Sequence, residues 1–159
     1  EEMDRLGMII DVSHLSDAGF YDVARAAKKP FVASHSNARA VCGWCRNLDD
    51  DMIRLLAQKG GVMGLNYCPA FLTDVAEGEC AHGTIAAIVE HAKHIVNVGG
   101  SDCLGLGSDF DGIKTHEELP DASYIPLLAD AFAKAGFTNT QIDKILFENV
   151  LRLYREVIG

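Results

Sequence analysis

The sequence predicts an α/β fold in which parallel strands alternate with helices. Four short apolar runs are each followed by a helical segment, in the order β-α-β-α-β-α-β-α. The strand candidates are apolar throughout rather than alternating, which is typical of parallel strands covered on both faces. With 159 residues, the chain is long enough for a hydrophobic core. We therefore expect residues 1–159 to form a single domain.

The first two units each pair a short strand with an amphipathic helix. A strand is predicted at 8–11 and a helix at 16–27, where Ser16 is a suitable N-cap residue. The second unit has a strand at 31–34 and a helix at 49–59, which ends at a glycine pair. Both strands are followed by a Ser-His dipeptide, so each unit presents a histidine after its strand.

The third and fourth units have strands at 62–66 and 103–107. A loop at 67–83 precedes the helix of the third unit, which is predicted at 84–98. The rest of the chain is predicted to be helical: one helix at 122–135, one that begins at the Thr138-x-x-Gln141 capping box, and one at 150–157. Two architectures fit this order, an open α/β sheet or about half of a (β/α)8 barrel.

Polar side chains follow the strand candidates where catalytic groups lie in parallel α/β proteins. These residues are His14, His35, Asn66 and Asp109. Imidazole and carboxylate are usual zinc ligands, and zinc provides hydroxide near neutral pH. Each residue could instead cap a loop, but two histidines and an aspartate on three strand ends favour a metal site.

Four stretches carry a resemblance to a known family. They span 6–14, 30–37, 45–50 and 105–112, and end in or contain Asp-Val-Ser-His, Ser-His-Ser-Asn, Cys-Arg-Asn-Leu-Asp-Asp and Ser-Asp-Phe-Asp-Gly. In order and spacing they resemble the membrane dipeptidase (renal dipeptidase) family, peptidase family M19. The resemblance implies a TIM barrel, (β/α)8, of the metal-dependent hydrolase type. It implies that this chain holds about the C-terminal half of it, as four βα units.

The resemblance implies a zinc-dependent hydrolase of dipeptides and assigns roles to four residues. His14 and His35 correspond to ligands of the second of two zinc ions. Arg46 corresponds to the residue that binds the terminal carboxylate of the substrate, a role that suits a guanidinium group. Asp109 corresponds to a substrate-binding and catalytic carboxylate that moves the proton while a zinc-bridged hydroxide attacks the peptide carbonyl.

Other parts of the family's site have no counterpart in this sequence. A His-x-Asp pair, a bridging glutamate and a further substrate-contacting histidine are missing, and no His-x-Asp pair occurs anywhere in the chain. The isolated chain is therefore expected to hold zinc weakly or not at all, and to be inactive or nearly so. An alternative is a non-catalytic half-barrel stabilised by homo-oligomers, because its sheet would have open edges and an uncovered inner face.

Composition limits the partners. The net charge of −9 argues against nucleic acid, which binds clustered Lys and Arg. No apolar run approaches the roughly 20 residues of a membrane span. The five cysteines are expected to be reduced, which predicts a cytoplasmic location. They are Cys42, Cys45, Cys68, Cys80 and Cys103.

Two further motifs have functional alternatives. Cys42 and Cys45 form a C-x-x-C motif, which can mark a redox site or half of a zinc knuckle. The motif lies in a loop and lacks a second cysteine pair, so neither function is favoured. His91 and His94 are three residues apart on a helix and could bind a metal, but such pairs are more often solvated or capping groups.

Overall fold

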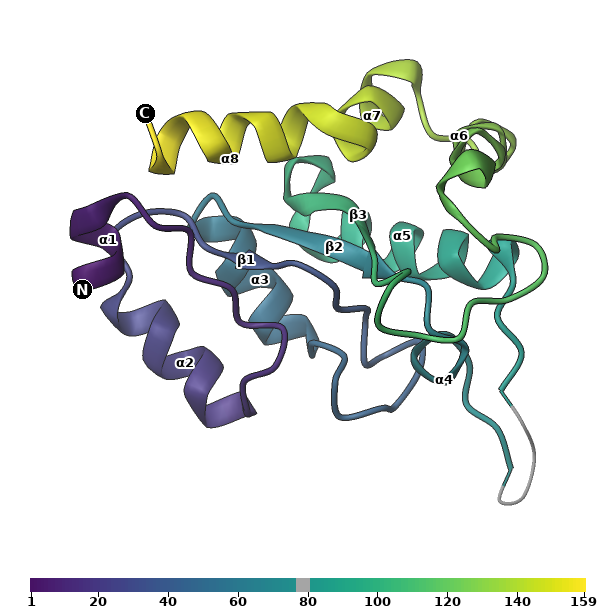
Figure 1. The fold of residues 1–159 in the computed structure, drawn as a ribbon, viewed down its shortest axis with the longest axis horizontal. Helices are drawn as coiled ribbons and strands as arrows, with labels where there is room; N and C mark the ends of the chain where they lie inside the picture. Colours follow the sequence, from purple (N-terminus) through teal and green to yellow (C-terminus); the bar gives the residue numbers. More distant parts are fainter. Residues whose placement is uncertain (77–80) are drawn as a thin grey trace.

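Three parallel strands form the sheet of the computed structural model, which describes residues 1–76 and 81–159 (Figure 1). They are β1 (Val32–Ala33), β2 (Val62–Asn66) and β3 (Leu104–Ser108), hydrogen-bonded in the order β1-β2-β3. The α/β class and the parallel order of these three predicted strands are confirmed. Together with the surrounding helices, the sheet fits part of a barrel. Cys80 lies outside the described residues.

The segment predicted as the first strand, 8–11, is not a strand of this sheet. It makes one parallel bridge, between Asp11 and Val32. Two backbone hydrogen bonds hold it there, from Val12 to the Val32 carbonyl at 2.8 Å and from Val32 to the Ile10 carbonyl at 2.9 Å. Because β1 is only two residues long, it offers segment 8–11 too few residues to form a longer ladder of parallel hydrogen bonds. The prediction of four complete βα units is therefore not confirmed.

Most helices begin where the sequence predicts them. The side chains of Ser16, Asp49, Thr84 and Thr138 each accept a hydrogen bond from a backbone amide of the following turn. The α-helices are α1 (Glu2–Leu6), α2 (Asp17–Ala26), α3 (Asp50–Gln58), α4 (Pro69–Leu72), α5 (Ile85–Gly99), α6 (Ile125–Lys134), α7 (Asn139–Asp143) and α8 (Asn149–Val157). Three short helical turns complete the structure: η1 (Ser101–Cys103) between α5 and β3, η2 (Ala122–Tyr124) directly before α6, and η3 (Lys144–Glu148) between α7 and α8. Helices α1 and α4 were not predicted. Within the described residues, no helix has the length and apolar character needed to cross a membrane.

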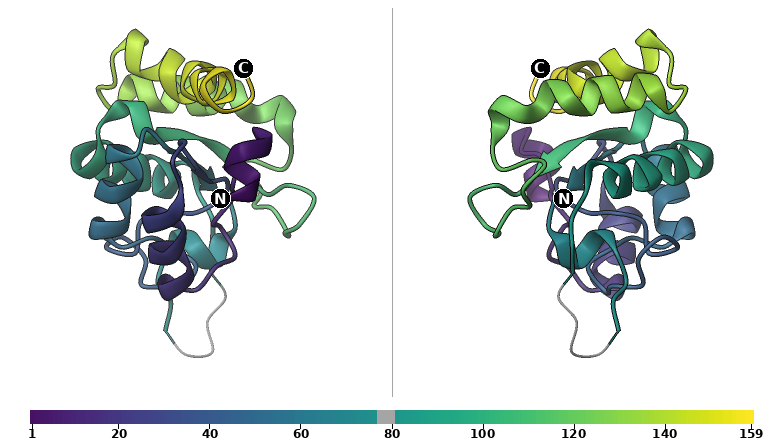
Figure 2. Two further views of the ribbon diagram at one scale, coloured as in Figure 1. Left: turned by 90° about the vertical axis from the view of Figure 1, so that its left-hand side faces the viewer. Right: turned by 90° about the vertical axis from the view of Figure 1, so that its right-hand side faces the viewer.

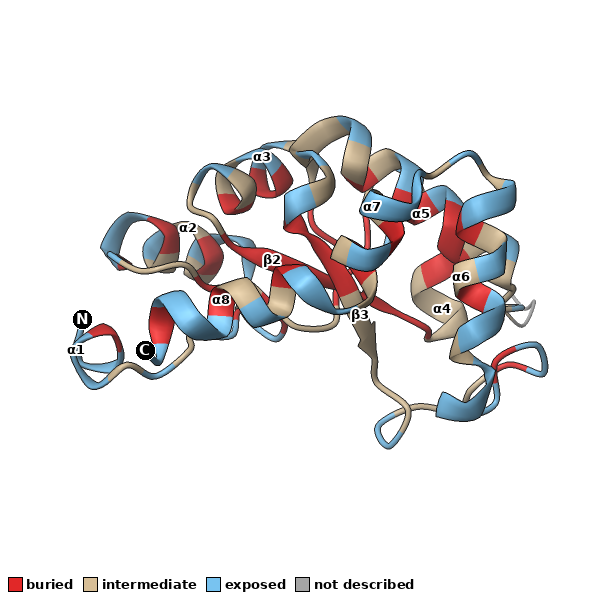
Figure 3. Ribbon diagram, turned by 90° about the horizontal axis from the view of Figure 1, so that it is seen from above, coloured by how far each residue is buried: buried red, intermediate tan, exposed pale blue. Residues whose placement is uncertain are grey.

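Helices α2, α3 and α5 cover one face of the sheet. Helix α3 packs between α2 and α5. Figure 3 shows β2 and the start of β3 buried between the surrounding helices, whereas the rest of β3 is half-buried. Ala33, Met63 and Leu65 on the strands, and Phe31 just before β1, are fully buried in this core. All five residues of β2 are buried, so this strand is covered on both faces, as its continuous apolar sequence predicts.

Helix α8 covers part of the opposite face of the sheet, which the half-barrel alternative predicted to be uncovered (Figures 1 and 2). Leu153 and Val157 pack against Val62 at the start of β2. The Arg152 guanidinium donates to the Gly60 carbonyl at 2.8 Å and to the Asp102 carbonyl at 3.0 Å, which fastens α8 across the amino-terminal ends of the strands. An apolar pocket of about 270 Å³ remains on this face.

The C-terminal helices form one continuous helical run rather than two separate helices. Residues 144–148, between α7 and α8, are a π-helical turn. The inward residues Ile145, Asn149, Leu153 and Val157 recur every four positions. In a regular α-helix that spacing would rotate each successive side chain by about 40°. The wider π-helical turn offsets part of this rotation, so that the Asn149 amide reaches the carbonyls of Ser101 and Leu104.

Two glycines permit close contact between the strands beneath the site. A Cβ atom on Gly64 would lie 2.2 Å from the Ser34 carbonyl oxygen and 2.7 Å from the Cα of Gly107. We expect Gly64→Ala to lower the free energy of unfolding by about 1–3 kcal/mol, because backbone atoms must move apart. Gly43→Ala is the control, since its Cβ would only approach Asp74 at 3.7 Å. Equal urea midpoints for the two variants would contradict this prediction.

Candidate metal centre and active site

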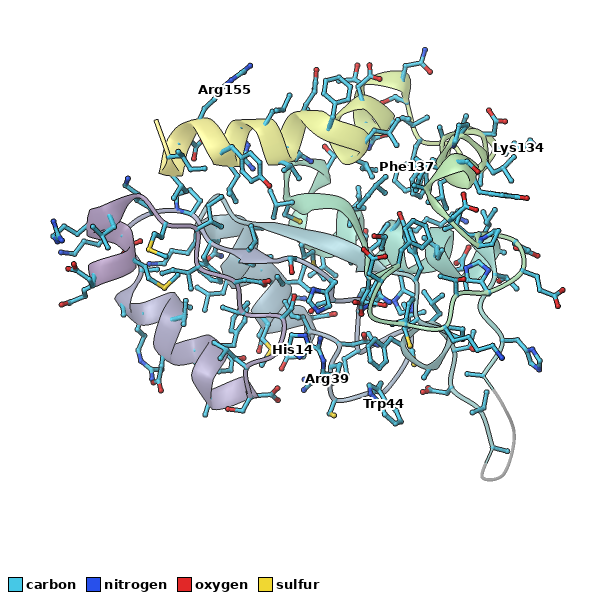
Figure 4. All side chains as sticks on the ribbon, in the orientation of Figure 1. His14, Arg39, Trp44, Lys134, Phe137 and Arg155 are labelled. Carbon is cyan, nitrogen blue, oxygen red and sulfur yellow. The ribbon has the colours of Figure 1, made fainter. Side chains whose placement is uncertain are left out.

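The four residues singled out from the sequence gather at the carboxyl ends of the strands. His14, Arg46 and Asp109 line one pocket of about 610 Å³. His35 adjoins it, with its Nε2 atom 2.9 Å from Nε2 of His14. Figure 4 shows His14 on the side of the molecule opposite Arg155 of α8. Arg152 of α8 contacts the carbonyls of Gly60 and Asp102, just before β2 and β3, whereas the pocket residues follow the strands. The pocket therefore lies at the end of the strands away from these contacts.

The two imidazoles have the geometry of a pair of metal ligands. Their rings are 4.9 Å apart and inclined at 56°, with the two Nε2 atoms turned toward each other. Zinc bonded tetrahedrally at about 2.0–2.1 Å holds two ligand nitrogens roughly 3.3 Å apart, so small ring movements would suffice. Among residues 1–76 and 81–159, no group of three or more His, Cys, Asp or Glu side chains is arranged to hold a metal. The residues present therefore fit two positions of a zinc site.

Burial and nearby charges set the protonation state of the His35 imidazole. Burial lowers the pKa of its imidazole, while the nearby carboxylates of Asp109 and Asp11 act in the opposite direction. At neutral pH the ring is therefore neutral, which is the form that binds metal. Loss of hydration would raise the pKa of Asp11, but hydrogen bonds from Ser34 and from the Ser13 amide outweigh it and lower that pKa. Asp11 is thus an ionised carboxylate next to the site.

Asp109 is held by a turn that follows β3. Its backbone has a φ of 70°, and a register shift between Leu65 and Asn66 marks the irregular end of the strand pair. The Asn66 amide donates to Oδ2 of Asp109 at 3.1 Å. A Cβ on Gly112 would press against Oδ1 of Asp109, so a larger residue at this position would displace the carboxylate. Asn66 was recognised as a strand-end residue, but its contact with Asp109 could not be read from the sequence.

Arg46 lies on an aromatic support in a firmly anchored loop. Its guanidinium carbon is 5.7 Å from the ring centre of Phe71, on which Trp44 also stacks. Arg39 anchors the loop by two hydrogen bonds of 2.8 Å to Asp17 and by donation to the carbonyls on either side of Arg46. In Figure 4, Arg39 and Trp44 lie on the same side of the molecule as His14. The roles of Arg39 and Phe71 were not predicted.

His91 and His94 do not form a metal site. His91 is fully buried, which differs from the solvated or capping position that was expected. Its Nδ1 accepts a hydrogen bond from the Ala38 amide at 3.1 Å, and its Nε2 lies 3.0 Å from the Leu72 carbonyl. His94 instead contacts Asp50 at 2.7 Å. His91 therefore joins α5 to the loop after β1 and to α4, beneath the candidate site.

The burial of His91 predicts a pH dependence of stability. Burial lowers its pKa in the folded state, so the unfolded chain binds a proton at a higher pH than the folded chain. Stability is then complete above about pH 6.5 and falls as the pH drops toward the folded pKa, by up to about 1.4 kcal/mol per pH unit. His91→Gln should reduce this slope in urea titrations between pH 7 and pH 5. An unchanged slope would show that His91 does not contribute.

The C-x-x-C motif lacks the environment of a redox site. Cys42 is buried, and burial raises the pKa of its thiol, whereas reactive cysteines have a lowered pKa. Cys42, Cys45, Cys68 and Cys103 are all free thiols. The structure therefore assigns Cys42 to packing, next to the carbonyl of Ala70 in α4.

Comparisons with known proteins point to one family. The family model for membrane dipeptidase (peptidase family M19) matches residues 1–158. A Klebsiella pneumoniae protein, named as an uncharacterized protein in the pqqA 5' region, is 40% identical over 158 residues, which are 99% of this chain and 58% of that protein. Dipeptidase tcpJ of Claviceps purpurea (strain 20.1) is 36% identical over 157 residues, 98% of this chain and 36% of that protein.

Solved structures show the same fold. The crystal structure of dipeptidase AC, a metallopeptidase of family M19, superposes with a TM-score of 0.91 at 34% identity, over 99% of this chain and 46% of that one. A metallopeptidase from Rhodobacter sphaeroides, liganded with a phosphinate mimic of the dipeptide L-Ala-D-Ala, also gives 0.91 at 34% identity, over 98% and 44%. The chain thus spans from about a third to somewhat over half of the length of these relatives.

Proposed function

Because the chain belongs to the membrane dipeptidase family, peptidase family M19, we propose that the complete gene product hydrolyses dipeptides at a zinc centre. This chain would contribute His14 and His35 to that centre. The observation that carries the proposal is the convergence of both imidazoles with Arg46 and Asp109 around one pocket. Two relatives named as dipeptidases, and one solved with a dipeptide mimic, support a dipeptide as the substrate.

Each residue would act through a group that it presents to the pocket. The Arg46 guanidinium would bind the terminal carboxylate of the dipeptide, held in place by its contact with Phe71. The Asp109 carboxylate would take and return a proton during attack and departure of the amine. Zinc, when bound, supplies Lewis-acid polarisation and makes a bound water more acidic. Apolar side chains on the pocket wall, from Pro69, Phe71 and Ile113, would exclude water from the substrate.

The isolated 159-residue chain is proposed to be inactive or nearly so. Its described residues offer two metal-ligand imidazoles, whereas a zinc ion normally takes four ligands. The test compares hydrolysis of a dipeptide such as L-Ala-D-Ala by the complete gene product and by the 159-residue chain, before and after chelation and zinc addition. Activity only in the zinc-loaded complete product is expected. Activity that survives complete removal of metal would contradict the zinc mechanism.

A second candidate function is a non-catalytic half-barrel stabilised by pairing of two copies. It is favoured by the apolar pocket on the face of the sheet that α8 covers only in part, together with the exposed side chains of Tyr154 and Ile158 on and next to α8. Sedimentation analysis of the 159-residue chain tests it, together with a dipeptide-hydrolysis assay at saturating zinc. A stable dimer without dipeptidase activity would support this candidate, and a monomer would contradict it. We also propose a cytoplasmic location, since the four described cysteines are free thiols.

A further inference from the structure

A chain of hydrogen bonds runs behind the metal-facing nitrogen of His35. Nδ1 of His35 lies 2.7 Å from Oγ of Ser34, and this hydroxyl lies 2.5 Å from Oδ2 of Asp11. On the other side of the ring, Nε2 of His35 faces Nε2 of His14 at 2.9 Å. Asp11 comes from the segment that bridges β1, while Ser34 and His35 directly follow β1. The two segments therefore meet at this chain of contacts.

The donors and acceptors determine where each proton lies. An ionised carboxylate can only accept, so the Ser34 hydroxyl donates its single proton to Asp11. The same oxygen must then accept a hydrogen bond from Nδ1–H of His35. A neutral imidazole has one N–H, so Nε2 of His35 keeps a free lone pair directed at the candidate zinc position.

We propose that Asp11 and Ser34 are positioning residues that fix His35 in the Nδ1-protonated tautomer, which leaves Nε2 ready to bind zinc. The inference rests on the metal centre of the proposed function. Without this pair, His35 would be free to adopt the tautomer in which Nε2 carries the proton and cannot bind a metal. Such outer partners of a ligating histidine fix its tautomer and its ring orientation.

The backbone around His35 is held separately from the ring. The His35 amide donates to Oγ of Ser13 at 2.9 Å. Oδ1 of Asp11 accepts from the amides of Ser13 and Ser34, both at 3.0 Å. Asparagine at position 11 can keep these two backbone contacts through its own oxygen. The substitution Asp11→Asn therefore changes mainly the group that faces the Ser34 hydroxyl.

The hydrogen bonds from Nδ1 of His35 to Ser34 and from Ser34 to Asp11 form a relay. Asp11→Asn is expected to reverse the direction of both hydrogen bonds. Its amide nitrogen would donate to Oγ of Ser34, and the hydroxyl would turn its proton toward Nδ1 of His35. His35 would then carry its proton on Nε2. We expect zinc affinity of the complete gene product, measured by competition with a chelator, to fall by about 10–100-fold. Ser34→Ala removes the relay without reversing it, so its zinc affinity should fall by less.

The tautomer itself is read without metal or substrate. Long-range ¹H–¹⁵N spectra of the zinc-free complete product should place the His35 proton on Nδ1 in the wild type and on Nε2 in Asp11→Asn, with His35→Gln to assign the signal. Asp22→Asn, on the exposed face of α2, is the matched control and should change neither readout.

A wild-type His35 protonated on Nε2, or an Asp11→Asn variant with unchanged tautomer and zinc affinity, would overturn the proposal. Failure of the proposed function is a different result: the tautomer and zinc affinity respond as expected, but the zinc-loaded wild type hydrolyses no dipeptide. Ser34→Ala gives an independent test if Asp11→Asn does not fold, because a wild-type tautomer population in that variant also contradicts the relay.

Discussion

Replacement of Asp109 by asparagine is expected to lower kcat for dipeptide hydrolysis by about 10²–10⁴-fold in the complete gene product, with little change in KM. Asparagine has the size of aspartate and can still accept the hydrogen bond from the Asn66 amide. It cannot take up a proton, so the variant would keep the shape of the pocket and lose the proposed proton transfer. The effect should therefore appear in turnover rather than in substrate binding.

Steady-state kinetics of zinc-loaded wild type and Asp109→Asn check this prediction. Asp111→Asn is the matched control, because Asp111 is exposed, lies two residues further along the same turn and does not line the pocket. Its kcat should remain close to the wild-type value. Undiminished turnover in Asp109→Asn would show that another group moves the proton.

Removal of the Arg46 side chain is expected to raise KM for dipeptides by about 10–100-fold, with a smaller change in kcat. The guanidinium is proposed to make two charge-assisted hydrogen bonds to the terminal carboxylate of the substrate, and bonds to charged groups contribute about 1.5–3 kcal/mol each before solvent exposure weakens them. Its position above Phe71 and the anchoring of its loop by Arg39 should hold the Arg46 guanidinium in one orientation.

The substrate offers its own control for Arg46→Ala. The wild type should prefer a dipeptide with a free carboxylate to the same dipeptide with a C-terminal amide, and the variant should lose most of that preference. Arg46→Lys should recover only part of the affinity, because an ammonium group cannot make the bidentate contact. If Arg46→Ala weakened binding of the acid and the amide equally, the carboxylate-binding role would be wrong.

Local patterns in the sequence predicted much of the fold. Ser16, Asp49, Thr84 and Thr138 mark helix starts because each caps the turn that follows it. The apolar runs identified three parallel strands in their observed order, since strands buried on both faces require continuous apolar sequence. His14, His35 and Asp109 followed from the same rule, because parallel strands bring the residues after them to one end of the sheet. Arg46 followed instead from the resemblance to the dipeptidase family.

The sequence by itself therefore determined the α/β class, the strand order and the candidate residues His14, His35, Arg46 and Asp109. Only the tertiary structure decided which partners surround them and where α8 packs. The Asn66 contact with Asp109 and the Arg152 contact with Gly60 join residues 43 and 92 positions apart. Helical and strand periodicity reports which face of an element is apolar, but not which distant element covers that face. Such contacts depend on the packing of the whole chain, so no local pattern specifies them.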